Sequence, residues 1–266
     1  MSVSLVISTY NRPDALFRVL ESVELQTKTP DEIIIADDGS DNKTKECIDD
    51  FNKSSNLKLI HSWQQDNGFR VAESRNKAIS KSTCNYIILI DGDMILHNKF
   101  IEDHLSHAEP GYFVQGARVF LNNTTTSSLL KNGLHSFSIF SRGLSNRKNA
   151  MYSVFFAKLF SKKKNYIKGI KTCNLAFYRK DCAEINGFNN DIIGWGREDT
   201  EFVVRLLNNG INRKNVHFNL IQFHLWHQDS SREFLNNNNK ILQNSINNSL
   251  VINGDTSDPA PKAAFQ

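Results

Sequence analysis

The chain has 266 residues, 39% of them hydrophobic and 23% charged, and its formal net charge is +4. These values are ordinary for a soluble globular protein, and the length allows a core that needs no disulfide or metal staple. No apolar run approaches the roughly 20 residues that cross a bilayer, so we expect no membrane-spanning segment.

The N-terminus and the cysteines indicate the compartment. The first seven residues lack a basic segment and a small-residue cleavage site, so they predict a strand rather than a signal peptide. The four cysteines form no Cys-x-x-Cys pair, which indicates reduced and mostly buried thiols. They are Cys47, Cys84, Cys173 and Cys182. We therefore expect a cytoplasmic protein.

Short apolar strands alternate with amphipathic helices over the first ninety residues. The expected strands are 3–8, 32–36, 57–61 and 86–90, and the expected helices are 15–25, 43–51 and 71–81. This alternation predicts an α/β fold with a mostly parallel central sheet and helices on both faces.

The second half of the chain is less regular. We expect strands over 113–120, 172–178 and 216–223, a polar loop over 122–128, and a helix over 199–208. A last helix is expected near 232–247, followed by a disordered tail.

Polar clusters follow three of the strands in the first half. They are Thr9-Tyr10-Asn11, Asp37-Asp38 and Asp91-Gly92-Asp93. Ligands of parallel sheets bind beyond the carboxyl ends of the strands, so the three clusters predict a nucleotide site at one edge.

Two further residues near this edge have open alternatives. Arg75 is predicted to point at a diphosphate or at Asp91, and the alternative is a surface arginine. A carboxylate of the segment Asp37-Asp38-Gly39-Ser40-Asp41 is predicted to accept the uracil imide N–H, and the alternative is a turn with a helix N-cap.

A metal site is predicted from acidic and histidine residues far apart in the sequence. Asp91 and Asp93 are one residue apart, so an extended chain directs both carboxylates to one face. Oxygen ligands suit Mg²⁺ or Mn²⁺, and imidazoles from His224 and His227 would favour Mn²⁺. The alternative is that one histidine packs beside Trp226 while the other lies on the surface.

A carboxylate base is predicted in the segment Gly194-Trp195-Gly196-Arg197-Glu198-Asp199. The two glycines free the backbone around Trp195, whose flat ring can contact a sugar. Either acid can serve as a general base near neutral pH. The alternative is that both are simply acids favoured at a helix start by the helix dipole.

The stretch 137–171 is both basic and aromatic. One interpretation is a solvated, mobile lid with a few core aromatics. The other is contact with an anionic membrane surface or a lipid-diphosphate acceptor. No nucleic-acid partner is expected, because the stretch matches no RNA- or DNA-binding motif.

With these motifs in hand, the chain resembles the family 2 inverting glycosyltransferases of the GT-A fold, which is Rossmann-like. The segments VISTYNR at 6–12, IIADDGS at 34–40 and DGD at 91–93 resemble the family's two nucleotide loops and its metal motif. GWGRED at 194–199 is similar to the base motif of β-1,4-galactosyltransferases and chondroitin-type polymerases. His224-x-x-His227 resembles the galactosyltransferase Met-x-x-His metal pair, with His224 in place of methionine.

The resemblance implies a role for each matching residue. The implied nucleotide-binding residues are Thr9, Tyr10, Asn11, Arg12, Asp38, Arg75 and Asp91; the sugar-binding residues are Trp195, Gly196 and Glu198; the metal ligands are Asp93, His227 and His224; and the base is Asp199. The implied domain covers 1–235, with a nucleotide-binding half to about 95 and an acceptor-binding half from 96, and residues 236–266 form a helix and flexible tail.

The resemblance also implies a reaction. It is the inverting, Mn²⁺- or Mg²⁺-dependent transfer of a sugar from a UDP-sugar to a glycan or lipid-linked saccharide. The implied setting is bacterial surface polysaccharide synthesis, in the cytoplasm or peripherally at the inner membrane. Two alternatives stay open: a sugar-nucleotide nucleotidyltransferase and a non-catalytic carbohydrate-binding protein.

Overall fold

A computed structural model describes residues 1–228 and 231–252 of the chain. Within these residues an eight-stranded sheet has the order β3-β2-β1-β4-β10-β6-β11-β9. Its strands are β1 (Val3–Thr9), β2 (Glu32–Asp37), β3 (Leu59–Trp63), β4 (Tyr86–Asp91), β6 (Tyr112–Gln115), β9 (Lys162–Lys163), β10 (Leu175–Tyr178) and β11 (Asn212–Asn215). The first four are parallel, and β10 is antiparallel to both of its neighbours.

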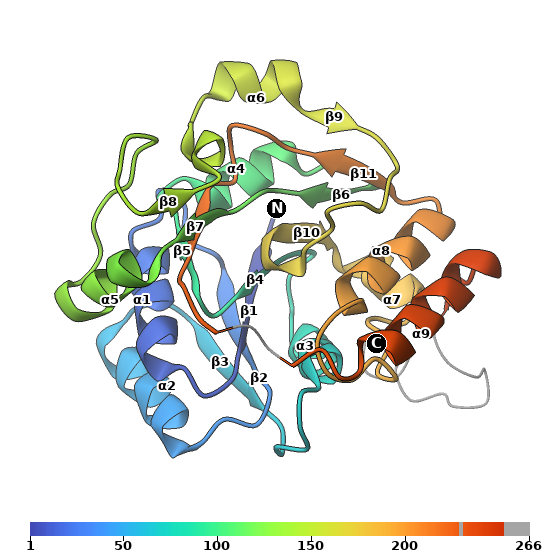
Figure 1. The fold of residues 1–266 in the computed structure, drawn as a ribbon, viewed down its shortest axis with the longest axis horizontal. Helices are drawn as coiled ribbons and strands as arrows, with labels where there is room; N and C mark the ends of the chain where they lie inside the picture. Colours follow the sequence, from blue (N-terminus) through green and yellow to red (C-terminus); the bar gives the residue numbers. More distant parts are fainter. Residues whose placement is uncertain (229–230, 253–266) are drawn as a thin grey trace.

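Helices cover both faces of this sheet (Figure 1). One face packs on α1 (Pro13–Glu24), α2 (Asn42–Ser54) and α4 (Phe100–His107), and the other on α3 (Val71–Ser80), α7 (Arg179–Glu184) and α8 (Glu198–Asn208). Alternate strand residues serve the two cores, since Ile33 and Ile35 belong to the first and Ile34 to the second. The predicted α/β fold with a mostly parallel central sheet is confirmed.

A smaller sheet brings the C-terminal part of the chain to the end of β4. Within the described chain its order is β5-β12-β7-β8, built from β5 (Met94–Leu96), β12 (Gln222–His224), β7 (Val119–Leu121) and β8 (Leu144–Ser145). His224 pairs with Met94, and the Leu225 N–H donates to the Asp93 carbonyl at 2.9 Å. Backbone pairing therefore places the histidine segment beside the DGD segment.

The predicted loop at 122–128 is wrong, because this segment starts a helix. Helix α5 runs over Asn123–Asn132, and the Asn122 side chain caps it by accepting from the Thr125 N–H at 2.9 Å. Leu129 of this helix is fully buried in the core. An N-cap side chain and one buried apolar position thus outweigh the low helix propensity of the threonines.

Two predicted strands of the second half are only partly correct. The segment 113–120 forms two strands in two different sheets, β6 and β7. The segment 172–178 starts as a 3₁₀ turn (Thr172–Asn174) and becomes β10 only at Leu175. In both cases the regular strand is interrupted where apolar spacing gives no sign of a break.

The strand predicted at 216–223 is mostly wrong. Only its end forms β12, while β11 lies just before it. Phe218 and Leu220 have positive φ values of +65° and +55°, which extended strands do not accommodate.

Helix α9 (Leu235–Asn247) confirms the predicted last helix, and the tail at 253–266 lies outside the described residues. The central sheet extends across the predicted boundary near residue 95, so both predicted halves share it. Their separate roles stay a prediction.

Candidate active site

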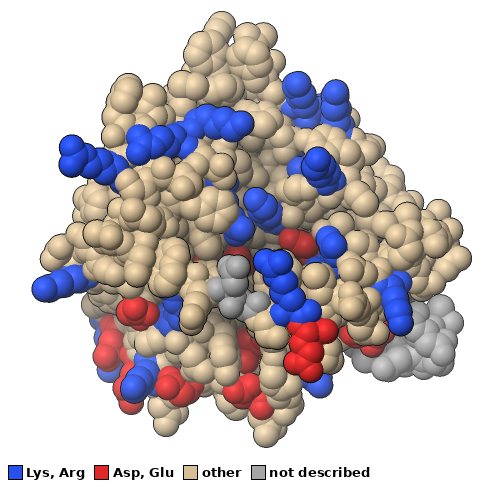
Figure 2. Space-filling model, in the orientation of Figure 1, with Lys and Arg blue, Asp and Glu red and all other residues tan. Residues whose placement is uncertain are grey.

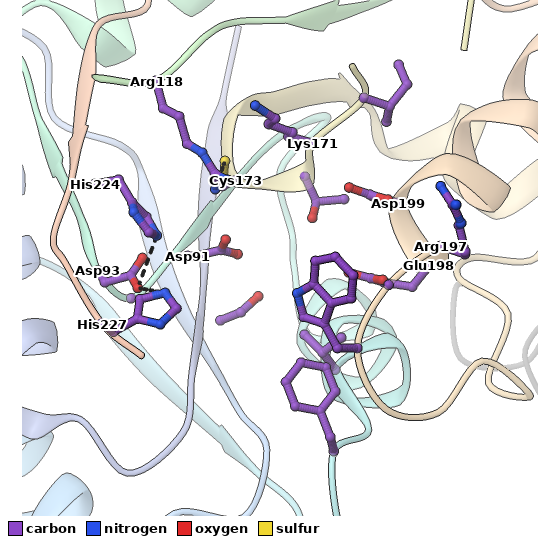
Figure 3. A pocket seen from close by; sticks show the side chains of 18 of the residues that line it. Asp91, Asp93, Arg118, Lys171, Cys173, Arg197, Glu198, Asp199, His224 and His227 are labelled. Atoms are coloured by element: carbon purple, nitrogen blue, oxygen red, sulfur yellow. Dashed lines mark hydrogen bonds and ion pairs between the residues drawn. The ribbon is translucent and has the colours of Figure 1, made fainter. Parts of the chain in front are cut away.

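A large cavity opens beyond the carboxyl ends of β1 and β4. Its volume is about 1380 Å³, which exceeds the roughly 300–1,000 Å³ of ordinary small-molecule pockets. Its lining comes from both sheets, from α3 and α8, and from the loops before and after them (Figure 3). A cavity of this size can hold two substrates side by side.

Nearly all residues selected from the sequence line this cavity. The lining includes Thr9, Tyr10, Arg12, Asp38, Arg75, Asp91, Asp93, Trp195, Gly196, Glu198, Asp199, His224 and His227. Asn11 is the exception: its N–H donates to Ser40 Oγ and its Oδ1 accepts from the Asp41 N–H. The structure therefore gives Asn11 a part in holding the loop, and its nucleotide contact stays a prediction.

Asp93, His224 and His227 form a compact cluster on one side of the cavity. Their ligand atoms all lie within 4.8 Å of one another. The distances from Asp93 Oδ2 to the Nε2 atoms are 3.5 Å for His224 and 3.3 Å for His227 (Figure 3). His224 ends β12, while His227 lies in the loop after it, so their convergence comes from the fold around them.

The protonation of this cluster suits a divalent cation. Burial, then the nearby Arg118 charge, lowers the pKa of His224 to about 3, so its imidazole is neutral. His227 Nδ1 lies 2.7 Å from the Gln228 carbonyl, which can only accept. In the neutral ring, His227 therefore turns the lone pair of Nε2 toward Asp93.

Asp93 supplies the charged ligand. Its Oδ2 accepts from Arg12 Nη1 at 3.2 Å, but its buried Oδ1 has no hydrogen-bond partner among the described residues. Burial and the neighbouring Asp91 raise the pKa of Asp93 to about 6. One carboxylate with an unpartnered oxygen and two imidazoles, close to one another, form the mixed oxygen and nitrogen set that Mn²⁺ accepts.

Arg75 links this side of the cavity to the opposite side. It is buried, with Nε donating to Ser8 Oγ at 3.0 Å and Nη2 to Asp91 at 3.2 Å. Its Nη1 reaches Glu198 at 3.5 Å. The predicted contact with Asp91 is present, and the surface-arginine alternative is wrong.

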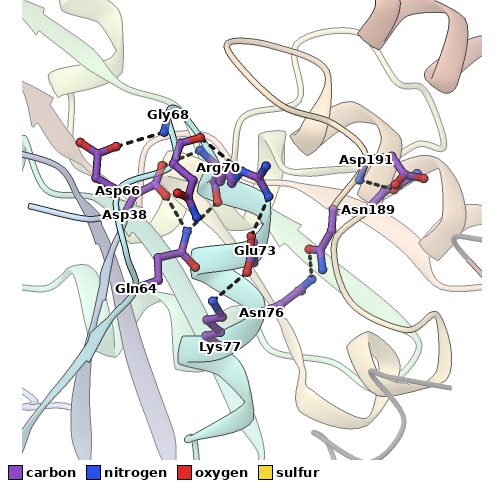
Figure 4. Close-up of polar contacts among 12 residues, drawn as sticks. Asp38, Gln64, Asp66, Gly68, Arg70, Glu73, Asn76, Lys77, Asn189 and Asp191 are labelled. Carbon is purple, nitrogen blue, oxygen red and sulfur yellow. Dashed lines mark hydrogen bonds and ion pairs between the residues drawn. The ribbon is translucent and has the colours of Figure 1, made fainter. Parts of the chain in front are cut away.

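Asp38 directly follows β2 and belongs to a network of polar contacts (Figure 4). Its carboxylate accepts from Gln64 Nε2 at 2.6 Å and from the Arg70 N–H at 2.7 Å. The Tyr10 hydroxyl donates at 2.9 Å to Asp66, which lies in the same loop between β3 and α3 as Gln64 and Arg70. Each Asp38 oxygen keeps a second lone pair, so its predicted uracil contact stays open as a prediction.

The loop before α8 has an unusual backbone. Gly194 and Gly196 have φ values of +70° and +97°, and Arg197 has +82° although it carries a side chain. A Cβ on Gly194 would lie 2.5 Å from the Phe234 ring. This conformation leaves Trp195 41% exposed over the cavity and starts α8 at Glu198. Positive φ at a non-glycine residue is typical of functional sites.

Asp199 lies across the cavity from the metal-ligand cluster (Figure 3). Its Oδ1 accepts from the Thr200 N–H at 2.7 Å, and burial, then the neighbouring Glu198, raises its pKa to about 7. A carboxylate with this pKa is well matched to general-base catalysis near neutral pH. Glu198 is instead engaged with Arg75, so the geometry distinguishes the two acids.

Arg118 and Lys171 also line the cavity and were not selected from the sequence. Both point into the space above Asp91, between the metal-ligand cluster and Asp199 (Figure 3). Neither forms an ion pair with a carboxylate of the described chain, and the Nε of Arg118 is buried there without a hydrogen-bond partner. Lys171 belongs to the basic stretch 137–171, and only the fold shows that this lysine and Lys168 line the site.

Comparison with known proteins decides the family. The sequence profile of glycosyl transferase family 2 matches residues 4–184, more than half of the chain. The chain belongs to glycosyl transferase family 2. The predicted glycosyltransferase is thereby confirmed at the level of this family. A profile described as the N-terminal domain of galactosyltransferase matches 153–228, which contains both Asp199 and the two histidines.

Curated relatives of this family 2 chain include two polysaccharide synthases and a glucosyltransferase. Hyaluronan synthase of Pasteurella multocida is 25% identical over 81% of the chain, and chondroitin synthase of Escherichia coli 25% over 80%. Validoxylamine A glucosyltransferase of Streptomyces hygroscopicus subsp. limoneus is 26% identical over 79%. The chain spans only 24%, 33% and 48% of these three proteins, respectively.

Solved structures support the fold. Crystal structures of S. aureus TarS 1–349 in complex with UDP and with UDP-GlcNAc superpose on the family 2 chain with TM-scores of 0.64 and 0.57. The match to the UDP complex has 13% sequence identity and covers 100% of this chain and 68% of the TarS chain. The match to the UDP-GlcNAc complex has 14% identity and covers 86% of this chain and 60% of the TarS chain. Throughout the described residues, no helix is both long and apolar enough to cross a membrane.

Proposed function

We propose that the chain transfers a sugar from a UDP-sugar to an acceptor hydroxyl in a single displacement with inversion. One observation carries this proposal: a three-ligand cluster and a carboxylate with a pKa of about 7 face each other across one cavity. The complexes of TarS with UDP and UDP-GlcNAc support a nucleotide sugar as the donor.

The nucleotide occupies the side of the cavity formed by the ends of β1, β2 and β4. Asp38 and Tyr10 contact the uracil, and Asp91, held by Arg75, contacts the ribose. Asp93, His224 and His227 would hold Mn²⁺ or Mg²⁺. When bound, such a cation neutralises charge on the departing diphosphate. Arg118 and Lys171 face the same phosphates from above.

Asp199 accepts the proton of the acceptor hydroxyl as that oxygen attacks the anomeric carbon. Its burial raises its proton affinity while Thr200 fixes its orientation. Trp195 offers its exposed ring to a sugar face, and Glu198 holds Arg75 in place. The reaction needs the base and the leaving group on opposite sides of the sugar, and the position of Asp199 across the cavity from Asp93, His224 and His227 supports this arrangement.

We infer a saccharide or lipid-linked saccharide as the acceptor, in the synthesis of bacterial surface polysaccharide such as lipopolysaccharide, O-antigen or capsule. The similarity to hyaluronan and chondroitin synthases supports a glycan product. The reduced cysteines, all four free, support action in the cytoplasm.

The test is a screen of UDP-sugars scored by UDP release with a lipid-linked monosaccharide acceptor and Mn²⁺. Acceptor-dependent release of UDP from one donor supports the proposal. Pyrophosphate release from UTP and a sugar phosphate would identify a nucleotidyltransferase instead. Sugar binding without any UDP release would identify a carbohydrate-binding protein.

A further inference from the structure

The charges of this chain are strongly segregated along its sequence. The segment 110–180 contains thirteen Lys and Arg residues and no Asp or Glu, although the whole chain has a net charge of only +4. The rest of the chain is therefore net acidic. Figure 2 shows Lys and Arg around the apex of the molecule, while Asp and Glu lie in the central hollow or below it.

The apex is helix α6 (Val154–Phe160), which projects beyond the sheets (Figure 1). Its inner face is anchored: Ala157 is buried, and the rings of Phe156 and Phe160 pack against Phe218 with centroids 5.6 and 5.7 Å apart. Ser153 caps its start by accepting from the Phe156 N–H. Packing against Phe218 and the Ser153 cap therefore fix α6 on the rest of the fold.

The outer face of α6 is apolar and open. Phe155 and Leu159 are four residues apart, so they share one face, and they are 71% and 63% exposed. Val154 beside them is 48% exposed. A soluble surface seldom leaves large apolar side chains together in this way, and such patches mark contact with a partner or a membrane.

Lysines surround this apolar face. Lys158 lies on the helix, and Lys162 and Lys164 follow it directly; all three are exposed and form no ion pair with any described residue. Lys163 differs because it pairs with Glu109 at 2.6 Å. Apolar side chains bordered by exposed cations complement one surface chemistry, an anionic phospholipid bilayer with apolar tails beneath its headgroups.

We propose that α6 and its flanking lysines dock this protein on an anionic lipid surface, with Phe155 and Leu159 inserted among the headgroups. The same segment continues into the wall of the cavity through Ile167 and Lys171. Docking thus places the cavity next to the bilayer, where a lipid-linked acceptor is available. This last link rests on the proposed function, whereas the membrane contact itself does not.

The test is flotation of the full chain with vesicles of phosphatidylcholine alone or mixed with phosphatidylglycerol. We expect flotation only with the anionic vesicles and its loss at high salt, because salt screens exposed charges. Replacing Lys158, Lys162 and Lys164 by Gln should weaken partitioning on the order of 10²-fold, since each cation contributes about fivefold.

A second variant tests the apolar part. The double variant Phe155→Ser with Leu159→Ser should lose about tenfold or more in partitioning for each side chain removed from the bilayer. Its UDP release with a soluble acceptor should be unchanged, because neither residue lines the cavity. The matched controls are Leu25→Ser, an exposed apolar side chain after α1, and Lys43→Gln with Lys45→Gln and Lys53→Gln on α2.

Three results would overturn the proposal. They are absence of flotation with anionic vesicles, equal loss in the control variants, and self-association of the chain that the Phe155→Ser and Leu159→Ser changes abolish. UDP release with a soluble acceptor but no flotation would refute the docking alone. Flotation without UDP release would refute the proposed function alone.

Discussion

Replacing Asp199 by Asn should trade activity for stability. The wild-type carboxylate titrates with a pKa of about 7 instead of the ordinary 3.8, chiefly because folding buries it and secondly because Glu198 adds a like charge. Folding therefore opposes its ionisation. A shift of about three pKa units corresponds to about 4 kcal/mol at pH above 7, at roughly 1.4 kcal/mol per unit.

The sign follows from the raised pKa. The wild type carries no penalty from this group below pH 3.8, where it is protonated in both states, and the penalty grows as pH rises toward about 7. The amide introduced by Asp199→Asn cannot ionise, so this variant should gain stability over the wild type as pH rises through this window. Chemical denaturation of both proteins at pH 4.5, 6 and 8 measures the difference.

The same variant should lose about 10²–10⁴ in kcat, the usual contribution of a general base, while binding UDP normally. In the wild type, kcat/KM should fall tenfold per pH unit below about 7 as Asp199 becomes protonated. The control is Asp191→Asn, an exposed carboxylate on the loop before the same helix. Two results would refute the assignment of Asp199 as a buried general base. They are turnover of the Asp199→Asn variant within tenfold of wild type, and a stability difference between the two proteins that does not change with pH.

Three further predictions concern other parts of the site and its support. His227→Ala should weaken Mn²⁺ binding by about tenfold or more, because even the loss of an outer-shell partner of a metal ligand costs about 10–100-fold. Full wild-type activity in excess chelator would contradict the metal site. Arg118→Gln should raise KM for the UDP-sugar about tenfold and leave KM for the acceptor unchanged. The control is Arg142→Gln at an exposed arginine. Equal effects of the two changes would count against a contact between Arg118 and phosphate. Arg205→Ala should cost about 3–5 kcal/mol in chemical denaturation, because buried Glu201 then loses its partner at 2.8 Å; a loss below about 1 kcal/mol would show that the pair does not hold α8.

The sequence predicted the first half of the fold well because local signals and tertiary packing agree there. The strands of residues 3–91 are short apolar runs, most of them buried on both faces, and the helices between them show regular apolar spacing. The second half depends on contacts that no local pattern carries. The division of 113–120 between two sheets depends on strands distant in sequence, and apolar spacing gives no sign of the positive φ of Phe218. The Asn122 cap is a local contact with Thr125, but the threonines that follow it have low helix propensity.

The site residues, like the fold, were predictable only where a local sequence pattern marks them. Asp93, Asp199 and His227 were selectable because carboxylates and imidazoles in short polar motifs have few roles other than chemistry. Lys171 was not, because its stretch contains many other lysines, and only the fold shows that this one and Lys168 line the cavity. Asn11 lies within a motif and its side chain bonds to the neighbouring loop, so its nucleotide contact stays a prediction.

The most direct test of the account is a crystal structure of the Asp199→Asn variant with Mn²⁺ and the UDP-sugar that the screen selects. The account predicts Mn²⁺ on Asp93, His224 and His227 in contact with the diphosphate, and the sugar ring between that cation and residue 199. A nucleotide bound away from these three ligands, or a sugar whose anomeric carbon faces away from residue 199, would contradict it.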